Sequence, residues 1–151
     1  MKRCCFAGHS EIYDTSELYK NLLLTIEKLI TNENVTEFRV GNYGKFDGLS
    51  AKAVRELKEK YPHIKLELVI PYLTASVTQY KEFYYKNYDS LLMAEIPEKT
   101  PKRLQIIKCN EYMVNSVDFV VCYINHSWGG AAKTVDFARR KNKTVINLGT
   151  L

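Results

Sequence analysis

The chain has 151 residues, of which 46% are hydrophobic and 26% are charged, and its formal net charge is +5. This length and composition are typical of a globular protein with a real core, so we expect residues 1–151 to form one domain. The basic residues form only short clusters, which argues against a nucleic-acid-binding stripe. The expected partner is therefore an anionic small molecule rather than nucleic acid.

Cysteine usage and hydropathy bear on the cellular compartment. Cys4, Cys5, Cys109 and Cys122 show no CxxC spacing, and buried reduced thiols are the simplest interpretation. No apolar stretch approaches the roughly 20 residues that a membrane span needs. The N-terminus does not resemble a signal peptide. We expect a cytoplasmic protein with no membrane partner.

The chain begins with an alternation of apolar runs and helical spacing. Residues 4–8 (CCFAG) predict a buried strand. Residues 14–17 (DTSE) resemble a capping box with Asp14 as the N-cap, and apolar residues then recur at helical spacing to about Asn32. Residues 36–41 (TEFRVG) predict a second strand.

The middle of the chain continues this alternation and then becomes rich in tyrosine. Apolar residues from Ala51 onward predict a second helix that stops near Pro62. Residues 65–73 (KLELVIPYL) predict a third strand. Residues 74–88 hold Tyr80 and other aromatic residues at mixed helical spacing, which core packing or a subunit contact explains better than a base-stacking platform does.

The last third of the chain has the clearest pattern. Residues 94–101 (AEIPEKTP) predict a loop, and residues 102–115 predict a helix. Residues 118–124 (DFVVCYI) predict a fourth strand, residues 130–141 a helix, and residues 144–149 (TVINLG) a fifth strand.

Strands separated by helices imply right-handed crossovers and a mostly parallel sheet. The predicted fold class is α/β: a Rossmann-like open, mostly parallel five-stranded sheet with helices on both faces. In such sheets ligands bind outside the carboxyl ends of the strands, where the strand order reverses. Three loops follow predicted strands at that edge, namely residues 8–14, 41–48 and 125–131.

The first loop carries groups suited to a phosphate or a sugar. Gly8 permits a tight turn and Ser10 supplies a hydroxyl. His9 can contact an anion or act as a catalytic acid or base, although a lone loop histidine is more often a turn or capping residue.

The second loop combines glycines, a cation and a carboxylate. Gly41 and Gly44 flank the turn, and Lys45 follows. Asp47 can cap the next helix, or it can accept hydrogen bonds from ribose hydroxyls and take part in catalysis. Both interpretations of Asp47 stay open.

The third loop places a glycine pair between a strand and a helix. Gly129 and Gly130 would let the backbone approach a ligand, with the helix amides and the helix dipole pointing at it, although a plain turn is the alternative. Trp128 can stack on a base or cover the site. The candidate ligand-binding residues of this loop are Asn125, Ser127, Trp128, Gly129, Gly130 and Ala131. Asp136 in the following helix is a candidate catalytic carboxylate, and no spacing suggests a metal or a cofactor.

The segments FAGHS, GNYGKFDGLSAKAV, CNEYMVNSVDFVVCY and WGGAAKTVD together resemble the SLOG superfamily of Rossmann-like domains. That superfamily includes the Lonely Guy nucleotide phosphoribohydrolases, the DNA-processing protein A domain and small proteins of the YpsA type. The resemblance extends over nearly the whole chain and is nearest in size to the small single-domain members. It implies binding of a nucleotide or a nucleotide-derived molecule at the glycine-bearing edge.

The chain departs from the phosphoribohydrolase pattern at the catalytic positions. Against the motif Pro-Gly-Gly-x-Gly-Thr-x-x-Glu, the defined positions after the proline are Gly129, Gly130, Ala132, Lys133 and Asp136. Cys109 stands where the resemblance places a catalytic arginine, and Lys108 precedes it. The resemblance thus supports a glycine pair for phosphate without the family's arginine and glutamate.

Three functions remain open from the sequence. The first is binding or sensing of a nucleotide-like small molecule. The second is hydrolysis of an N-glycosidic bond, as in a nucleoside monophosphate phosphoribohydrolase or a deoxyribosyltransferase-like enzyme. There Asp136 or Asp47 would stabilise the oxocarbenium-like sugar, and His9 or Asp136 would activate water. The third is a protein-interaction subunit that packs through residues 74–88. A homo-oligomer is expected and is compatible with each.

Overall fold

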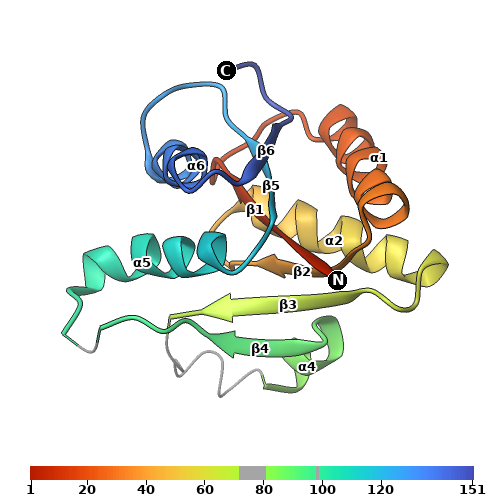
Figure 1. The fold of residues 1–151 in the computed structure, drawn as a ribbon, viewed down its shortest axis with the longest axis horizontal. Helices are drawn as coiled ribbons and strands as arrows, with labels where there is room; N and C mark the ends of the chain where they lie inside the picture. Colours follow the sequence, from red (N-terminus) through yellow and green to blue (C-terminus); the bar gives the residue numbers. More distant parts are fainter. Residues whose placement is uncertain (72–80, 98) are drawn as a thin grey trace.

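The computed structural model describes residues 1–71, 81–97 and 99–151. Within them, parallel strands form a six-stranded sheet in the order β4-β3-β2-β1-β5-β6 (Figure 1). The strands are β1 (Lys2–Gly8), β2 (Val35–Val40), β3 (Lys65–Ile70), β4 (Ser90–Met93), β5 (Phe119–Tyr123) and β6 (Thr144–Asn147). The predicted α/β class with a parallel sheet is confirmed.

The predicted number of strands was wrong, because five were expected and β4 was missed. β4 has only four residues, pairs with β3 alone, and has no buried residue among its four. A strand this short at the edge of a sheet has neither the continuous apolar run of a central strand nor a clear alternation.

The helices of the described residues are α1 (Ser16–Glu33), α2 (Lys45–Lys60), α4 (Lys81–Asn87), α5 (Lys102–Asn115) and α6 (Gly130–Arg140). Three of them, α1, α5 and α6, lie close to their predicted places, whereas α2 begins at Lys45 rather than near Ala51, and α4 was not predicted as a helix. The capping box was wrong in detail: Thr15 is the N-cap of α1 and makes no side-chain cap bond. Asp14 instead accepts a hydrogen bond from the Ser16 hydroxyl at 3.2 Å.

Two hydrophobic cores lie on opposite faces of the sheet. One packs α1 and α2 against residues such as Phe6 and Phe38, and the other packs α5 and α6 against residues such as Cys5 and Val120 (Figure 1). Because successive strand residues point to opposite faces, neighbouring Cys4 and Cys5 enter different cores. All four cysteines are buried and free, as the sequence predicted.

The strand order reverses at β1. From β1 the chain builds outward through β2, β3 and β4, and it then returns to place β5 on the other side of β1. At the end of β1, Gly8 is in register with Tyr123, and the His9 N–H donates to the Tyr123 carbonyl at 3.3 Å. The Lys45 N–H donates to the Ser10 carbonyl at 2.9 Å. The three predicted loops therefore meet at the point where the strand order reverses.

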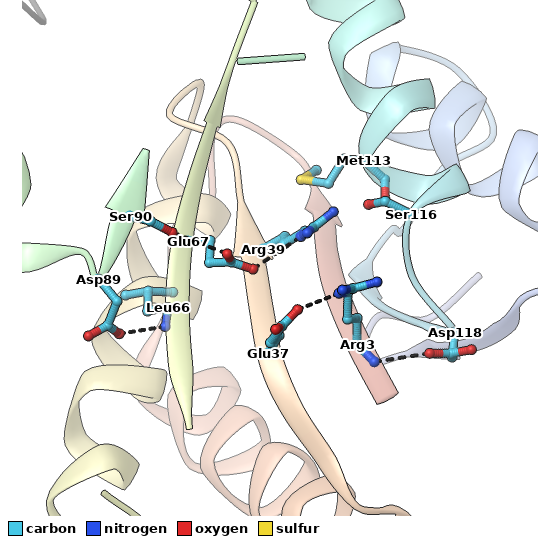
Figure 2. A network of polar contacts seen from close by, with 10 residues as sticks. All are labelled: Arg3, Glu37, Arg39, Leu66, Glu67, Asp89, Ser90, Met113, Ser116 and Asp118. Atoms are coloured by element: carbon cyan, nitrogen blue, oxygen red, sulfur yellow. Dashed lines mark hydrogen bonds and ion pairs between the residues drawn. The ribbon is translucent and has the colours of Figure 1, made fainter. Parts of the chain in front are cut away.

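A row of paired charges crosses the sheet on the face that carries α5 (Figure 2). Arg3 on β1 pairs with Glu37 on β2, and Arg39 on β2 pairs with Glu67 on β3 at 3.1 Å between Nε and Oε1. Glu67 also accepts a hydrogen bond from the Ser90 hydroxyl on β4 at 3.1 Å. We call these five residues the charge ladder.

The tyrosine-rich segment is described only in part, since residues 72–80, with Tyr80, lie outside the described residues. Tyr84 on α4 is buried in the core below α2, which fits the packing interpretation, whereas Phe83 is 59% exposed. A subunit contact in this segment stays a prediction.

Among the described helices, none has the length and apolar character to cross a membrane.

Candidate functional site

A cavity of about 840 Å³ opens at the carboxyl ends of the central strands. It lies where the strand order reverses, which is where open parallel sheets bind ligands. Ten residues predicted from the sequence line it: Gly8, His9, Ser10, Gly44, Asp47, Asn125, Trp128, Gly129, Gly130 and Ala131. The structure thus brings residues from all three loops to one cavity, and their roles in binding or catalysis remain predictions.

Three rings stack face to face in one wall of this cavity. The rings of His9 and His126 have centroids 3.9 Å apart and planes within 14° of each other. The rings of His126 and Trp128 have centroids 3.8 Å apart and planes within 18°. We call His9, His126 and Trp128 the ring column. Tyr123 meets His9 edge-on at 6.3 Å and 83°, which supports the inner end of the column.

The hydrogen bonding of His9 fixes its tautomer. The Asn125 backbone N–H donates to Nε2 of His9 at 3.0 Å, so in the neutral ring the proton sits on Nδ1. Burial lowers the pKa of His9 below its ordinary value, and the neighbouring His126 lowers it further. The lowered pKa favours the neutral ring of His9 over the cation. Nδ1 of His126 is enclosed and, among the described residues, has no hydrogen-bond partner.

Asp47 lies in the first turn of α2 and faces the cavity. Its Oδ2 accepts a hydrogen bond from the Tyr43 N–H at 3.1 Å, which closes the second loop. Burial raises the pKa of the Asp47 carboxyl to about 6, partly offset by that hydrogen bond. Gly44 is the N-cap of α2 and there is no side-chain cap bond, so the interpretation of Asp47 as the helix cap was wrong. The Asp47 carboxyl lines the cavity, and its role toward a ligand stays a prediction.

The start of α6 is shaped for a close approach of backbone to ligand. Gly129 has φ +95°, a conformation that favours glycine, and it serves as the N-cap without a side-chain cap bond. A Cβ added at Gly130 would have no atom within 4 Å, so this corner is open. The first turn holds no acidic residue. The first amides of a helix have no intrahelical acceptor, which leaves them available to an anion.

The glycines of the first two loops serve a different purpose. A Cβ at Gly8 would lie 2.3 Å from Cγ of Phe46, which is fully buried, and a Cβ at Gly44 would lie 2.6 Å from Cα of Ser10. Both glycines therefore allow the loops to pack against each other. Gly129 and Gly130 have no such neighbours and leave space for a ligand.

Four predicted site residues do not line the cavity. They are Gly41, Lys45, Ser127 and Asp136. Gly41 is buried, while Lys45 and Ser127 are exposed outside the lining. Asp136 is exposed on α6 and does not line the cavity, whereas Thr134 of the same turn does. A catalytic role for Asp136 stays a prediction.

The contribution of α5 was missed from the sequence. Ile106 and Asn110, one helical turn apart, line the cavity. Cys109, which the resemblance puts in the place of a catalytic arginine, is buried in the core with its thiol 3.9 Å from the Val69 carbonyl. On the face of α5 that meets the cavity, the polar group is thus the amide of Asn110 and not the cation that the resemblance would imply.

The electrostatic character of the cavity is acidic. Its lining includes the carboxylates of Glu11, Asp14 and Asp47 together with the two imidazoles. Within the described part of the chain, no lysine or arginine lines it. Nor does that part hold a group of three histidine, cysteine or acidic side chains placed to bind a metal ion. An anion in this cavity would be bound by backbone amides.

Comparison with known proteins places the fold but not the function. No family model matches the chain. Over 141 residues it is 27% identical to the uncharacterized SPbeta prophage-derived protein YoqJ of Bacillus subtilis (strain 168), covering 82% of this chain and 81% of that protein.

Two solved structures of DNA processing protein A are similar in fold. The protein from Streptococcus pneumoniae superimposes with a TM-score of 0.69 at 14% identity, over 97% of this chain and 50% of that one. A structure describing the single-stranded DNA binding mode of the Helicobacter pylori protein superimposes with a TM-score of 0.67 at 11% identity, over 97% and 64%. The chain thus spans only part of these longer proteins. The Rossmann-like fold implied by the SLOG resemblance is shared with them.

Proposed function

We propose that this protein binds a nucleotide or a nucleotide-derived small molecule in the cavity at the end of β1 and β5. The observation that carries the proposal is the open, uncapped Gly129–Gly130 start of α6, which lines an 840 Å³ cavity where the strand order reverses. The resemblance to small YpsA-type members and, more distantly, to Lonely Guy enzymes supports a ligand of this kind.

The phosphate of the ligand is expected at the start of α6. The N–H groups there have no intrahelical acceptor, and the positive end of the helix dipole lies behind them. No acidic residue in the first turn would repel the phosphate. Gly129 and Gly130 allow its oxygens to reach the backbone without meeting a side chain.

The charges of the lining favour a ligand with one phosphate. Glu11, Asp14 and Asp47 add negative charge, and no described lysine or arginine lines the cavity to offset it. Strands of nucleic acid and polyphosphates are bound largely through lysine and arginine. A nucleoside monophosphate carries less charge, and its sugar hydroxyls can donate hydrogen bonds to carboxylates.

Gly130→Pro is the sharpest test, because proline at the first helical position removes one N–H while it preserves the helix. Its matched control, Gly130→Ala, keeps the N–H, and its Cβ has open space. Loss of one hydrogen bond to a charged phosphate should weaken binding of adenosine 5′-monophosphate by the proline variant about tenfold or more. Calorimetry measures this affinity. Alanine keeps this N–H but places a Cβ in the open corner, so it should weaken binding less than proline does. Equal affinities in the two variants, or no binding by the wild-type protein, would contradict the proposal.

Hydrolysis of an N-glycosidic bond is the alternative that Asp47 favours. This carboxyl titrates near neutrality, and neutral His9 lines the same cavity. Such a pair can supply a carboxylate for the oxocarbenium-like sugar and a base for water. The expected result is release of free base from a nucleoside monophosphate by wild type and none by Asp47→Asn. Background release by both proteins would exclude the enzyme.

Single-stranded DNA is a second candidate ligand, because the neighbour from Helicobacter pylori binds it according to its description. The expectation that nucleic acid is not a partner is weaker for that reason. A strand bound through phosphates would show affinity that falls steeply with salt. Fluorescence anisotropy of a labelled thymidine oligonucleotide at low and physiological salt measures this. We rank it below a mononucleotide because no described lysine or arginine lines the cavity.

A further inference from the structure

Trp128 is an exposed aromatic side chain with one covered face. It lines the cavity, and one face of its indole stacks on His126 with a centroid distance of 3.8 Å. The residue is nonetheless 69% exposed, so the opposite face of the indole is open. A large aromatic surface left open at the mouth of a cavity provides apolar area that a ligand can bury.

The orientation of this indole is set before any ligand arrives. His126 lies between Trp128 and His9 in the ring column, with successive planes within 18° and 14°. His9 is held in turn by the Asn125 N–H at its Nε2 and by the edge-on ring of Tyr123. A side chain already ordered by its neighbours loses little conformational entropy when a ligand packs on it.

We propose that Trp128 is a base-stacking platform, on which a planar heteroaromatic ring of the ligand adds a fourth ring to the column. This inference rests on the proposed function, and it specifies the base as the part of the ligand that Trp128 recognises. Trp128 lines the same cavity as Gly129 and Gly130, so one ligand can contact the indole and the phosphate site together. Every nucleobase has a stackable face, so the platform discriminates little between bases but separates nucleotides from sugar phosphates.

The chain offers a site-specific probe because Trp128 is its single tryptophan. The probes are the four common ribonucleoside 5′-monophosphates and ribose 5-phosphate, with calorimetry for affinity and intrinsic fluorescence for stacking. The nucleotides should bind and quench the emission. Ribose 5-phosphate should bind more weakly and leave the emission unchanged, because it lacks a ring to stack.

Substitution separates the platform from the phosphate site. Base–aromatic stacking energies predict that Trp128→Ala weakens nucleotide binding roughly tenfold, while its affinity for ribose 5-phosphate stays the same. Trp128→Phe keeps a ring and should retain most of the nucleotide affinity. Phe83→Ala is the matched control, since Phe83 is 59% exposed and lies outside the cavity lining, and it should change neither affinity.

The possible outcomes distinguish the two proposals. Nucleotide binding that leaves the emission unchanged and survives Trp128→Ala would overturn the platform while the proposed function stands. An equal loss of nucleotide and ribose 5-phosphate affinity in Trp128→Ala would overturn it too, because the residue would then act on the site as a whole. No binding of any probe by the wild-type protein would overturn both.

Discussion

The charge ladder and the cavity are two polar regions of one sheet, and they differ in how far their buried polar groups are paired with protein partners. In the ladder, Arg39 and Glu67 are 11% and 13% exposed at the side chain and lie 3.1 Å apart (Figure 2). In the cavity, Asp47 accepts one hydrogen bond from a backbone amide and has a raised pKa, and Nδ1 of His126 has no partner among the described residues.

This difference in pairing suggests which polar groups stabilise the fold and which are available to a ligand. A half-buried charge with a partner is already compensated, and it has little left to offer a ligand. A polar group that is enclosed without a partner costs the folded state free energy, and such groups gather at functional sites. We therefore assign the ladder to the stability of the sheet, and the cavity remains the proposed ligand site.

The largest effect is expected in the ladder, from Glu67→Ala. The substitution leaves the largely buried Arg39 without its partner, which should lower the free energy of unfolding by about 3 kcal/mol. Urea denaturation followed by circular dichroism measures it. Nucleotide affinity should not change.

Two further variants serve as controls for the ladder. Glu33→Ala, at the exposed Lys2–Glu33 pair, should alter stability little, because both side chains are about half exposed. The double variant Arg39→Met with Glu67→Leu should recover most of the lost stability, because it leaves no unpaired charge. A ladder variant that weakened nucleotide binding would remove the distinction between the two regions.

A smaller effect is expected at the wall of the cavity, from Gly8→Ala. The new Cβ would lie 2.3 Å from the buried Phe46 ring, and overpacking of this kind should lower the free energy of unfolding by about 2 kcal/mol. Gly48→Ala on α2 is the matched control, since its Cβ would have no atom within 4 Å. That control should stabilise the helix by about 0.5–1 kcal/mol. Equal effects at the two glycines would mean that the cavity wall is loosely packed.

The sequence predicted the fold well where burial leaves a strong pattern. β5 could be placed because four of its five residues are buried, as the continuous apolar run indicated. β4 could not, because its short sequence SLLM lies at a sheet edge with no buried residue. Topology then located the loops, since a parallel sheet brings the carboxyl ends of β1, β2 and β5 to one edge.

The detailed site depended on contacts that no local pattern encodes. His9 stacks on His126 only because β1 and β5 are paired in a particular register, with Gly8 opposite Tyr123. Asp136 was chosen from a motif position, whereas the facing residue of α6 is Thr134. Asn110 was missed because the orientation of α5 follows from packing between helices, which the sequence alone does not reveal.

The buried carboxyl of Asp47 allows a test of the cavity by pH. Its folded-state pKa of about 6 lies above the ordinary value of 3.8, so its contribution to stability is present below the lower value and is lost as pH rises through the higher one. Asp47→Asn keeps an acceptor for the Tyr43 N–H and removes this loss. The variant should therefore be more stable than wild type at pH 7.5, with the difference shrinking toward pH 4. A difference independent of pH would mean that Asp47 is solvated like a surface carboxylate.

The smallest effect is expected at Asp136, and it tests whether residues just outside the cavity lining take part in binding or chemistry. The residue is exposed on α6 and does not line the cavity, so Asp136→Asn should leave nucleotide affinity and any release of free base unchanged. Asp47→Asn, measured beside it, should alter both, because that carboxyl faces the cavity. If Asp136→Asn instead abolished base release, the glycosidase chemistry would follow the phosphoribohydrolase motif position. The reacting sugar would then lie on the exposed side of α6, and Asp47 and His9 in the cavity would need another ligand.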